Sequence, residues 1–525
     1  MRSSSLTPIA LCVASASFSY PQRLIAQRLD DPKLGRIEFP TSGSAAAQPQ
    51  FLRGVLYLHS FEYDSAAKYF REAQRVDPGY AMAYWGEAMT YTHPVWNEQN
   101  VDSARAALAR LGASPAARRA RAGTPREQAY MNAVEALYGE GSKPKRDTLY
   151  SDAMRRIVRA FPSDREASAF YSLSLLGLNQ GVRDVATYLK AAAPMEKLFA
   201  ENPRHPGAAH YLIHSYDDPA HAAKALAAAR AYSAIAPGAA HAQHMTSHIF
   251  IALGMWPDVV KANETALALQ PEAGHYRQWL AYGYLQQGRI AAARAVIDSM
   301  RIPADMTAMG PAMRSSLLTL YAIDAPNGGA VIDSVQPTGV ALWEARVQFV
   351  RAYTGYLARD RARIEQASSQ IDAAANRIRA PNRPALARNL QIVETMGGMA
   401  RAMLLAVSGR SDSAVAILRG VADRQDKLPF DFGPPTTLKP PRELLGELLL
   451  ADGKPAAART EFERSLGTAP NRTAAVLGLA RASAAMGDKA AARKAYGELI
   501  ATLSHADPTL PWRVEADRGA QAASP

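Results

Sequence analysis

The sequence predicts an all-α fold in which helical hairpins repeat along a solenoid. Pro203, Pro237 and Pro271 recur every 34 residues, and each closes a stretch of helical character. A fixed period of this size is the sequence signature of a repeat architecture. Alanine is plentiful and aromatic residues make up only 8% of the chain, which favours closely packed helices over sheets. At 525 residues the chain is also longer than a single compact core usually supports.

Small and large residues recur in step with the prolines. Counting back from Pro78 and Pro470 gives the same places for small residues, where two helices cross, and for aromatic residues, which fill the space beside them. These places hold Gly54, Tyr57, Ala66, Phe70 and Ala73 in one unit, Leu445, Gly446, Ala458 and Phe462 in another, and Leu479, Ala480, Ala492 and Tyr496 in the next. The pattern resembles the tetratricopeptide repeat (TPR) family. This resemblance implies a TPR-type helical-hairpin solenoid that forms a right-handed superhelix, with the first helix of each hairpin lining a concave groove.

The chain is expected to contain segments of different character. In order, we predict a signal peptide and linker (1–26), an N-terminal TPR array (51–301), an irregular linker (302–340), helical repeats (341–425), a loop rich in proline and glycine (426–441), a C-terminal TPR pair (442–502) and a flexible tail (503–525). The linker and the loop are assigned because proline and glycine interrupt the helical pattern there. Chain ends are often loosely ordered, and we expect this of the tail and of residues 17–48.

The N-terminus, MRSSSLTPIALCVASASFS, has the features of a signal peptide. A charged residue precedes an apolar stretch, and Ala14-Ser15-Ala16 supplies small residues for cleavage. We therefore predict export to the periplasm, with the cytoplasm as the alternative. The only cysteine, Cys12, lies in this segment, so the rest of the chain can form neither disulfides nor thiolate metal sites. No later stretch has the run of about 18 apolar residues that predicts a transmembrane segment.

Charge and motifs exclude several classes of function. The formal net charge is +12, but the basic residues are scattered and do not alternate with aromatic residues. This favours a solvated surface and predicts no nucleic-acid partner. The motifs HExxH, GxxxxGK[ST] and GxSxG are absent from the sequence, so a zinc-protease helix, a P-loop and a hydrolase elbow are not supported.

Histidines gather in one part of the chain. Seven of the eleven fall between residues 205 and 248, and six of these lie in the segments HPGAAHYLIHSYDD and HAQHMTSHIF. Equivalent places in the two segments are 34 residues apart, so His210 corresponds to His244, and His214 to His248. In TPR proteins these places face the groove, and the same is implied for His241, Asp217 and Asp218. Residues three or four apart on a helix are about 5–6 Å from each other, and packed helices are about 8–10 Å apart, so the side chains can converge.

Convergent imidazoles and carboxylates without thiolates suit a divalent transition metal such as zinc, copper or iron. The predicted ligands are His210, His214, Asp217, His241, His244 and His248. Asn263 stands where other units have an aromatic residue, so we expect it to hold a neighbour by a hydrogen bond, and Asp218 is a further candidate for this role. In the alternative interpretation, the groove binds a peptide or partner protein. The histidines then make binding pH-dependent, because imidazoles charge between about pH 5 and 8, or they are purely structural.

A second resemblance adds candidates. The runs GVLYLHSFEYDSAAKYFREAQRVDPGYAMAYWGEAMTYTHPVW, HYLIHSYDDP, HAQHMTSHIF and FGPPTTLKP are similar to those of a bacterial group of TPR proteins with no assigned activity. This resemblance draws attention to His59, Glu62, Glu87, His93 and Trp96. For His59 and His93 we favour helix capping or packing over metal binding, because they lie several repeats away. His275 extends the cluster by one repeat. Whether the chain is an enzyme is left open; in a metal-assisted reaction, Asp217 or Glu87 would serve as the base.

Overall fold

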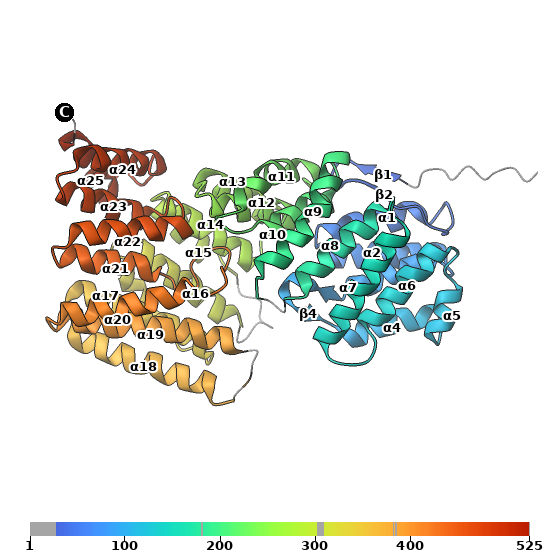
Figure 1. The fold of residues 1–525 in the computed structure, drawn as a ribbon, viewed down its shortest axis with the longest axis horizontal. Coiled ribbons are helices and arrows are strands. Elements are labelled where there is room, and N and C mark those ends of the chain that lie inside the picture. Colours follow the sequence, from blue (N-terminus) through green and yellow to red (C-terminus); the bar gives the residue numbers. More distant parts are fainter. Residues whose placement is uncertain (1–27, 180–181, 302–308, 382, 384–385, 524–525) are drawn as a thin grey trace, which may run out of the picture.

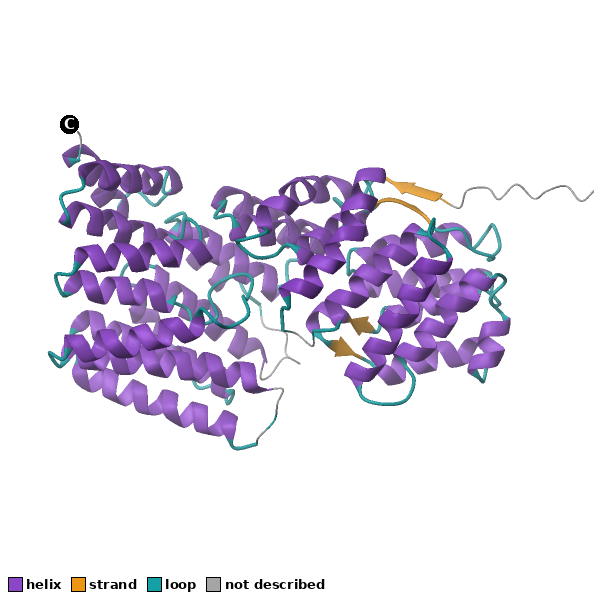
Figure 2. Ribbon diagram, in the orientation of Figure 1, coloured by secondary structure: helices purple, strands orange, loops and turns teal. Residues whose placement is uncertain are grey.

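The computed structural model describes residues 28–179, 182–301, 309–381, 383 and 386–523, so the predicted signal peptide at 1–26 lies outside the described residues. The described chain is helical apart from two short antiparallel hairpins of strands (Figure 2). Nearly every helix packs against the next in sequence, and alternate helices such as α10 and α12 or α21 and α23 also touch. The predicted all-α solenoid of stacked helical hairpins is confirmed.

The N-terminal part lies at one end of the molecule (Figure 1). Helix α6 begins at Pro125 because the side chain of Thr124 accepts a hydrogen bond from the backbone N–H of Glu127. The elements of this part are β1 (Arg28–Asp31), β2 (Gly35–Glu38), α1 (Gln48–His59), α2 (Tyr63–Val76), α3 (Ala81–Met89), β3 (Thr92–His93), η1 (Pro94–Trp96), β4 (Glu98–Gln99), α4 (Val101–Leu111), α5 (Pro115–Ala120), α6 (Pro125–Leu137), α7 (Lys143–Ala160), α8 (Arg165–Gly177) and α9 (Val185–Glu201).

The central part carries the histidines. Every residue of α10 and α12 is buried, so these helices are surrounded on all sides by protein. Small residues such as Ala208, Ala209 and Ala242 make this close packing possible. The helices are α10 (Pro206–Ser215), α11 (Ala222–Ile235), α12 (Ala240–Ala252), α13 (Trp256–Leu269), α14 (Gly274–Gln286) and α15 (Ile290–Asp298).

The C-terminal part stacks at the other end of the molecule (Figure 1). Its elements are α16 (Met309–Asp324), η2 (Gly328–Ser334), α17 (Ala341–Ala358), α18 (Arg361–Arg379), α19 (Ala387–Val407), α20 (Ser411–Gln425), α21 (Pro441–Ala451), α22 (Pro455–Thr468), α23 (Thr473–Ala485), α24 (Lys489–Thr502) and α25 (Pro511–Ala522).

Three segments predicted to be irregular are ordered. The predicted linker 302–340 contains α16 and η2, and Leu317 and Leu320 of α16 are buried in the core. The predicted flexible tail 503–525 contains α25, which packs against α24 and buries Ala516. Part of 17–48 forms the β1–β2 hairpin, with Ile37 and Phe39 fully buried. The prolines and glycines in these segments mark the helix ends, and the apolar residues between them are sufficient for packing.

Helix α19 is, within the described ranges, the one helix long and apolar enough to cross a membrane by length and composition alone. Half of its most apolar window is buried inside the protein. Met396, Met399 and Met403 are fully buried and belong to the C-terminal core, where α19 packs against α17, α18, α20 and α21. Its apolar character is therefore explained by packing within the solenoid.

A buried charge network joins the central and C-terminal parts. The guanidinium of Arg472, at the start of α23, donates to Asp324 at 2.5 Å, to Glu443 at 2.8 Å and to the hydroxyl of Tyr282 at 3.0 Å. Lys439 donates to Glu443 at 2.7 Å. Because the charges are paired and their hydrogen bonds satisfied, the network fixes the C-terminal repeats against α14 and α16.

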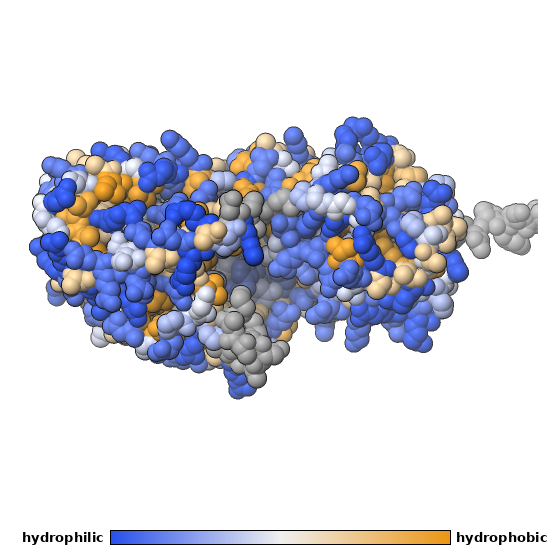
Figure 3. Space-filling model, turned by 90° about the horizontal axis from the view of Figure 1, so that it is seen from below, coloured by the Kyte–Doolittle hydropathy of each residue, from blue (hydrophilic) through white to orange (hydrophobic). Residues whose placement is uncertain are grey.

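The solenoid curves strongly enough for the first repeat to reach the centre. Helix α1 contacts α10, although the two are about 150 residues apart in sequence, and the backbone oxygen of His59 accepts a hydrogen bond from His210. The space-filling view shows the surface hollowed near the middle of the molecule (Figure 3). The loop 426–440 crosses the centre from α20 to α21, and its Phe432 contacts the ring of His248.

The crossing of paired helices can be tested at two glycines. A Cβ atom added to the buried Gly478 would overlap the ring of Phe462, whereas one added to Gly497 meets nothing within 4 Å. We expect Gly478→Ala to lower the free energy of unfolding by about 1–3 kcal/mol, and Gly497→Ala to raise it by about 0.5–1 kcal/mol. Urea denaturation measures both. Effects of the same sign would contradict the close packing at Gly478.

Candidate metal centre

The groove histidines divide into two sets. We name His210, His214 and His241 the first set, and His244, His248 and His275 the second set; within each, one nitrogen of every imidazole lies within 4.8 Å of the others. Helices α10 and α12 supply the first set, while α12 and α14 supply the second. The sets are neighbours, because the ring centroids of His214 and His248 are 6.0 Å apart and those of His241 and His244 are 6.1 Å apart.

In the second set, neighbouring side chains determine which imidazole nitrogen carries the proton. Asn263 donates its amide N–H to the oxygen of Val259, so its Oδ1 accepts from Nδ1 of His244 at 2.7 Å. Nδ1 of His248 donates to Asp217 at 2.6 Å. Both Nδ1 atoms therefore carry the proton, and both Nε2 atoms carry a lone pair. Asn263 forms the kind of hydrogen bond that its polar character led us to expect.

The two Nε2 atoms of His244 and His248 are 3.2 Å apart. With both protons on Nδ1, two lone pairs face each other, and neither nitrogen can donate to the other. A cation between them removes this conflict. Two nitrogens at about 2.0–2.1 Å from a tetrahedral zinc ion lie about 3.3 Å apart, so the spacing suits two ligands of one ion. His275, which is exposed at the edge of the groove, is the third member of this set.

In the first set, three buried nitrogens are unpaired. Nε2 of His210, His214 and His241 has no hydrogen-bond partner among the described residues. Nδ1 of His210 donates to the backbone oxygen of His59 at 2.7 Å. Nε2 of His210 is therefore unprotonated and has a free lone pair. Buried polar atoms are normally satisfied, and these three unpaired nitrogens lie close enough together to share one metal ion.

Burial keeps these imidazoles neutral. It lowers the pKa of His210 to about 3, and it lowers the pKa values of His214, His241 and His244 well below the ordinary histidine value. The neutral imidazole is the form that binds a metal ion. The charging between pH 5 and 8 that we expected for the peptide-binding alternative is therefore wrong for these four residues, since desolvation moves their protonation to more acidic pH.

Aromatic side chains enclose both sets. Phe61, whose backbone has the left-handed φ of 54°, places its ring 4.3 Å from that of His210. Trp96 is 5.6 Å from His241 and is 42% exposed. In the second set, the ring of His248 has Trp279 at 4.3 Å and Phe432 at 5.0 Å. A non-glycine residue in this region of φ is strained, and such residues concentrate at functional sites.

Two predicted carboxylates lie outside both sets of three donors. Asp217 is buried and accepts from Nδ1 of His248 through one carboxylate oxygen, while its other oxygen has no hydrogen-bond partner among the described residues. Asp218 forms an ion pair with Arg183 at 2.6 Å and accepts from Nδ1 of His221 at 2.8 Å. Both lie beyond the last turn of α10, where the chain turns away from the axis of the groove.

Among the secondary candidates, the two glutamates lie outside both sets. Glu62 accepts the backbone N–H of His241 at 3.0 Å and so satisfies a donor in the first turn of α12. Glu87 is buried, and its carboxylate is held by Arg71, Arg110 and Gln74. It is therefore not placed to act as the base beside the histidines that we had considered.

His93 also lies outside both sets. Its ring stacks on Tyr63 at 4.0 Å, and its Nδ1 is 3.3 Å from Glu98. His93 ends the short strand β3, so it has a packing role, consistent with the interpretation that we favoured for it.

His59 is close to the cluster but belongs to a third, hydrogen-bonded group. Its Nε2 donates to Glu166 at 2.7 Å, and its Nδ1 accepts from Tyr211 at 2.9 Å. Nδ1 of His205 accepts the backbone N–H of Ala208, so its Nε2 donates to Glu166 at 3.0 Å. Every imidazole nitrogen of this group is satisfied, and none has a lone pair free for a metal ion.

Glu166 is the centre of this third group. Burial raises the pKa of its carboxyl, but the two histidines outweigh this effect and hold the pKa well below the usual range. We expect Glu166→Gln to lower the free energy of unfolding by about 1–3 kcal/mol, because the amide N–H would face an imidazole N–H. Urea denaturation and metal analysis of the same sample test the assignment. Loss of stability with unchanged metal content is expected, and a lower metal content would show that the group binds metal.

Several residues at the site had no recognisable signal in the sequence. Glu166 lies 107 residues from its partner His59, and Phe432 lies in a loop far from His248 along the chain. Arg183, which donates to the backbone oxygens of His214 and Ser215, is likewise distant. His205 had a local signal, since it precedes Pro206 at a helix start, and it caps α10.

Comparisons with known proteins agree with the repeat architecture. Residues 47–80 and 449–506 match models of the tetratricopeptide repeat. Among curated proteins, none matches the chain. The chain is similar to solved structures of the APC/C hetero-tetramer Cut9–Hcn1 (13% identity, TM-score 0.33, covering 93% of this chain and 78% of that one), of the human IFIT1 dimer with m7Gppp-AAAA (12%, 0.35, 92% and 90%) and of yeast Tom70 (13%, 0.27, 91% and 95%). The two matches identify tetratricopeptide repeats at residues 47–80 and 449–506 of the chain.

Proposed function

We propose that the chain binds transition metal ions in its central groove, one at each histidine set. The observation that carries the proposal is the pair of Nε2 lone pairs of His244 and His248, which face each other at 3.2 Å while both Nδ1 atoms donate elsewhere. The three unpaired Nε2 atoms of the first set support a second ion. The donors are imidazoles alone, which suits zinc, copper or iron.

Each set has three protein ligands, so a bound ion would keep an open coordination position. Three protein ligands and one open position are typical of catalytic zinc sites, whereas structural sites have four protein ligands. Asp217 and Asn263 would orient the second set in the way that hydrogen-bonded partners of metal ligands do. The open positions allow water, an anion or a substrate to bind.

Metal analysis of the tag-free protein, purified without chelator, tests the proposal. We expect about two ions of zinc, copper or iron per chain and a higher melting temperature when the metal is restored after removal with EDTA, because a ligand that binds only the folded state stabilises it. Absence of metal, together with an unchanged melting temperature on addition of zinc or copper, would overturn the proposal.

Tetratricopeptide repeats generally mediate protein–protein interactions, and this is the second candidate function. The match at 449–506 favours it, since these repeats lie in α21 to α24, which carry none of the six histidines of the two sets. We also propose export to the periplasm, which rests on the N-terminal segment alone. N-terminal sequencing of the mature protein tests it, with cleavage near Ala16 as the expected result.

A further inference from the structure

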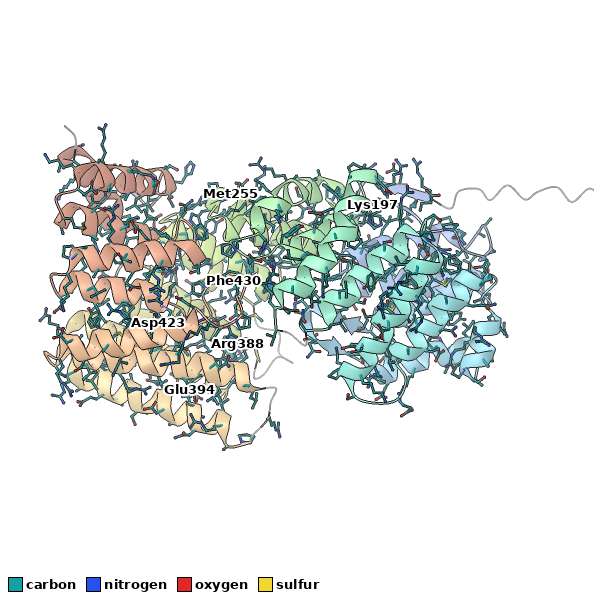
Figure 4. The ribbon with its side chains drawn as sticks, in the orientation of Figure 1. Lys197, Met255, Arg388, Glu394, Asp423 and Phe430 are labelled. Carbon is teal, nitrogen blue, oxygen red and sulfur yellow. The ribbon has the colours of Figure 1, made fainter. Side chains whose placement is uncertain are left out.

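A cavity of about 230 Å³ lies beside the second histidine set, between the central helices and the loop 426–440. Its walls are formed by the end of α12, the start of α13, the middle of α14, the end of α20, the start of α21 and the connection after α22. Figure 4 shows Phe430 of the loop in the middle of the molecule. Most of its lining side chains are apolar, including Ile251, Trp256, Leu428, Phe430, Pro435 and Pro470.

The charged groups at the cavity already have partners. Arg442 is held by Asp423, Asp426 and Glu461. Asp431 forms an ion pair with Arg388 and accepts from the hydroxyl of Thr436 at 3.3 Å.

The hydrogen-bonding groups of the aromatic walls are also engaged. The indole N–H of Trp256 donates to the backbone oxygen of Asn471 at 2.8 Å, and the hydroxyl of Tyr282 accepts from Arg472. A charged ligand would therefore have to break one of these interactions, whereas an apolar ligand would not.

The loop 426–440 separates the cavity from the histidines and presents different residues to each. Phe430 and Gly433 line the cavity, while Phe432 contacts His248 on the other side of the loop. Gly433 has φ of +90° and lies so close to the indole of Trp279 that an added Cβ would be 2.6 Å from it. The backbone can approach Trp279 only with glycine at this position, which closes the wall between the cavity and the second set.

We propose that this cavity is a binding site for a small, uncharged molecule with a single aromatic ring. The volume supports this class of ligand, because an apolar cavity of about 150 Å³ in another protein holds benzene. The flat aromatic and proline side chains that line the cavity, such as Trp256, Phe430 and Pro435, favour a planar ligand. The site does not depend on the histidines, and the ligand would lie one loop thickness from His248.

Fluorobenzene is a suitable probe, observed by 19F relaxation of the ligand with the full-length protein in EDTA, so that bound metal plays no part. We expect its signal to broaden in the presence of the protein. Ala469→Leu and Ala252→Leu, which extend two lining residues into the cavity, are each expected to reduce the broadening at least several-fold. Ala501→Leu, at an exposed position on α24, is the matched control and is expected to leave it unchanged.

A charged analogue completes the test. The 19F signal of 4-fluorobenzoate is expected to broaden far less than that of fluorobenzene, because the arginine side chains at the cavity are already paired with carboxylates. Two results would overturn the proposal: equal broadening of fluorobenzene with wild type and both filled variants, or equal broadening of the two probes. Because EDTA is present throughout, neither result bears on metal binding, which is measured separately.

Discussion

Replacing His244 and His248 together by alanine is expected to halve the metal content, from about two ions per chain to about one. The two residues supply two of the three nitrogens of the second set, and one remaining imidazole cannot hold an ion tightly. The first set keeps all its ligands. Metal analysis by inductively coupled plasma mass spectrometry measures the change, with His505→Ala, an exposed histidine outside both sets, as the matched control.

A second variant that disturbs packing less distinguishes the loss of metal ligands from partial unfolding. The double variant leaves Asp217 buried without its partner, which lowers stability. His275 is exposed at the groove edge, so His275→Ala should weaken the second set and leave the fold unchanged. The reciprocal variant, His210→Ala with His214→Ala, should remove the other ion. If either double variant loses both ions while remaining folded, the six histidines form one centre and the assignment of two sets is wrong.

The convergence of the histidines could be predicted from the sequence because the repeat is local. The period of 34 residues fixes which helix faces are equivalent, and the spacing of three and four residues places His210, His214, His241, His244 and His248 on one stripe. Position within the repeat also marked Asn263 as unusual. These inferences need only one hairpin and its neighbour, for which sequence distance and spatial distance are closely related.

The chemistry of the two histidine sets depends on contacts between residues that are far apart in the sequence, and a repeat pattern does not predict such contacts. The curvature of the solenoid brings α1 against α10, so that the backbone of His59 fixes the proton on His210. Asp217 appears equivalent to the histidines by helical position, yet the turn after α10 directs it to Nδ1 of His248. The loop that places Phe432 on His248 is anchored from the C-terminal repeats. Each of these contacts depends on how the whole solenoid curves and not on one repeat and its neighbour.

The metal-free protein is expected to lose several kcal/mol of stability between pH 7.5 and pH 5. Burial lowers the pKa values of His59, His210, His214, His241 and His244 below the unfolded value of about 6.5, and that of His210 to about 3. The unfolded chain therefore binds more protons than the folded chain below about pH 6.5. The stabilising contribution of each neutral imidazole is fully present above this pH and decreases as the pH falls towards the folded value.

One pKa unit corresponds to about 1.4 kcal/mol, so each buried histidine contributes at most about 2 kcal/mol to the change between pH 6.5 and pH 5. Urea denaturation in EDTA at a series of pH values measures the slope. The His244→Ala, His248→Ala variant should show a shallower slope, because it lacks a histidine with a lowered pKa, while His505→Ala should retain the full slope. If the free energy of unfolding of the wild-type protein hardly changes with pH, the imidazoles are hydrated or already protonated in the folded state. The groove would then lack the neutral, dehydrated nitrogens from which metal binding is inferred.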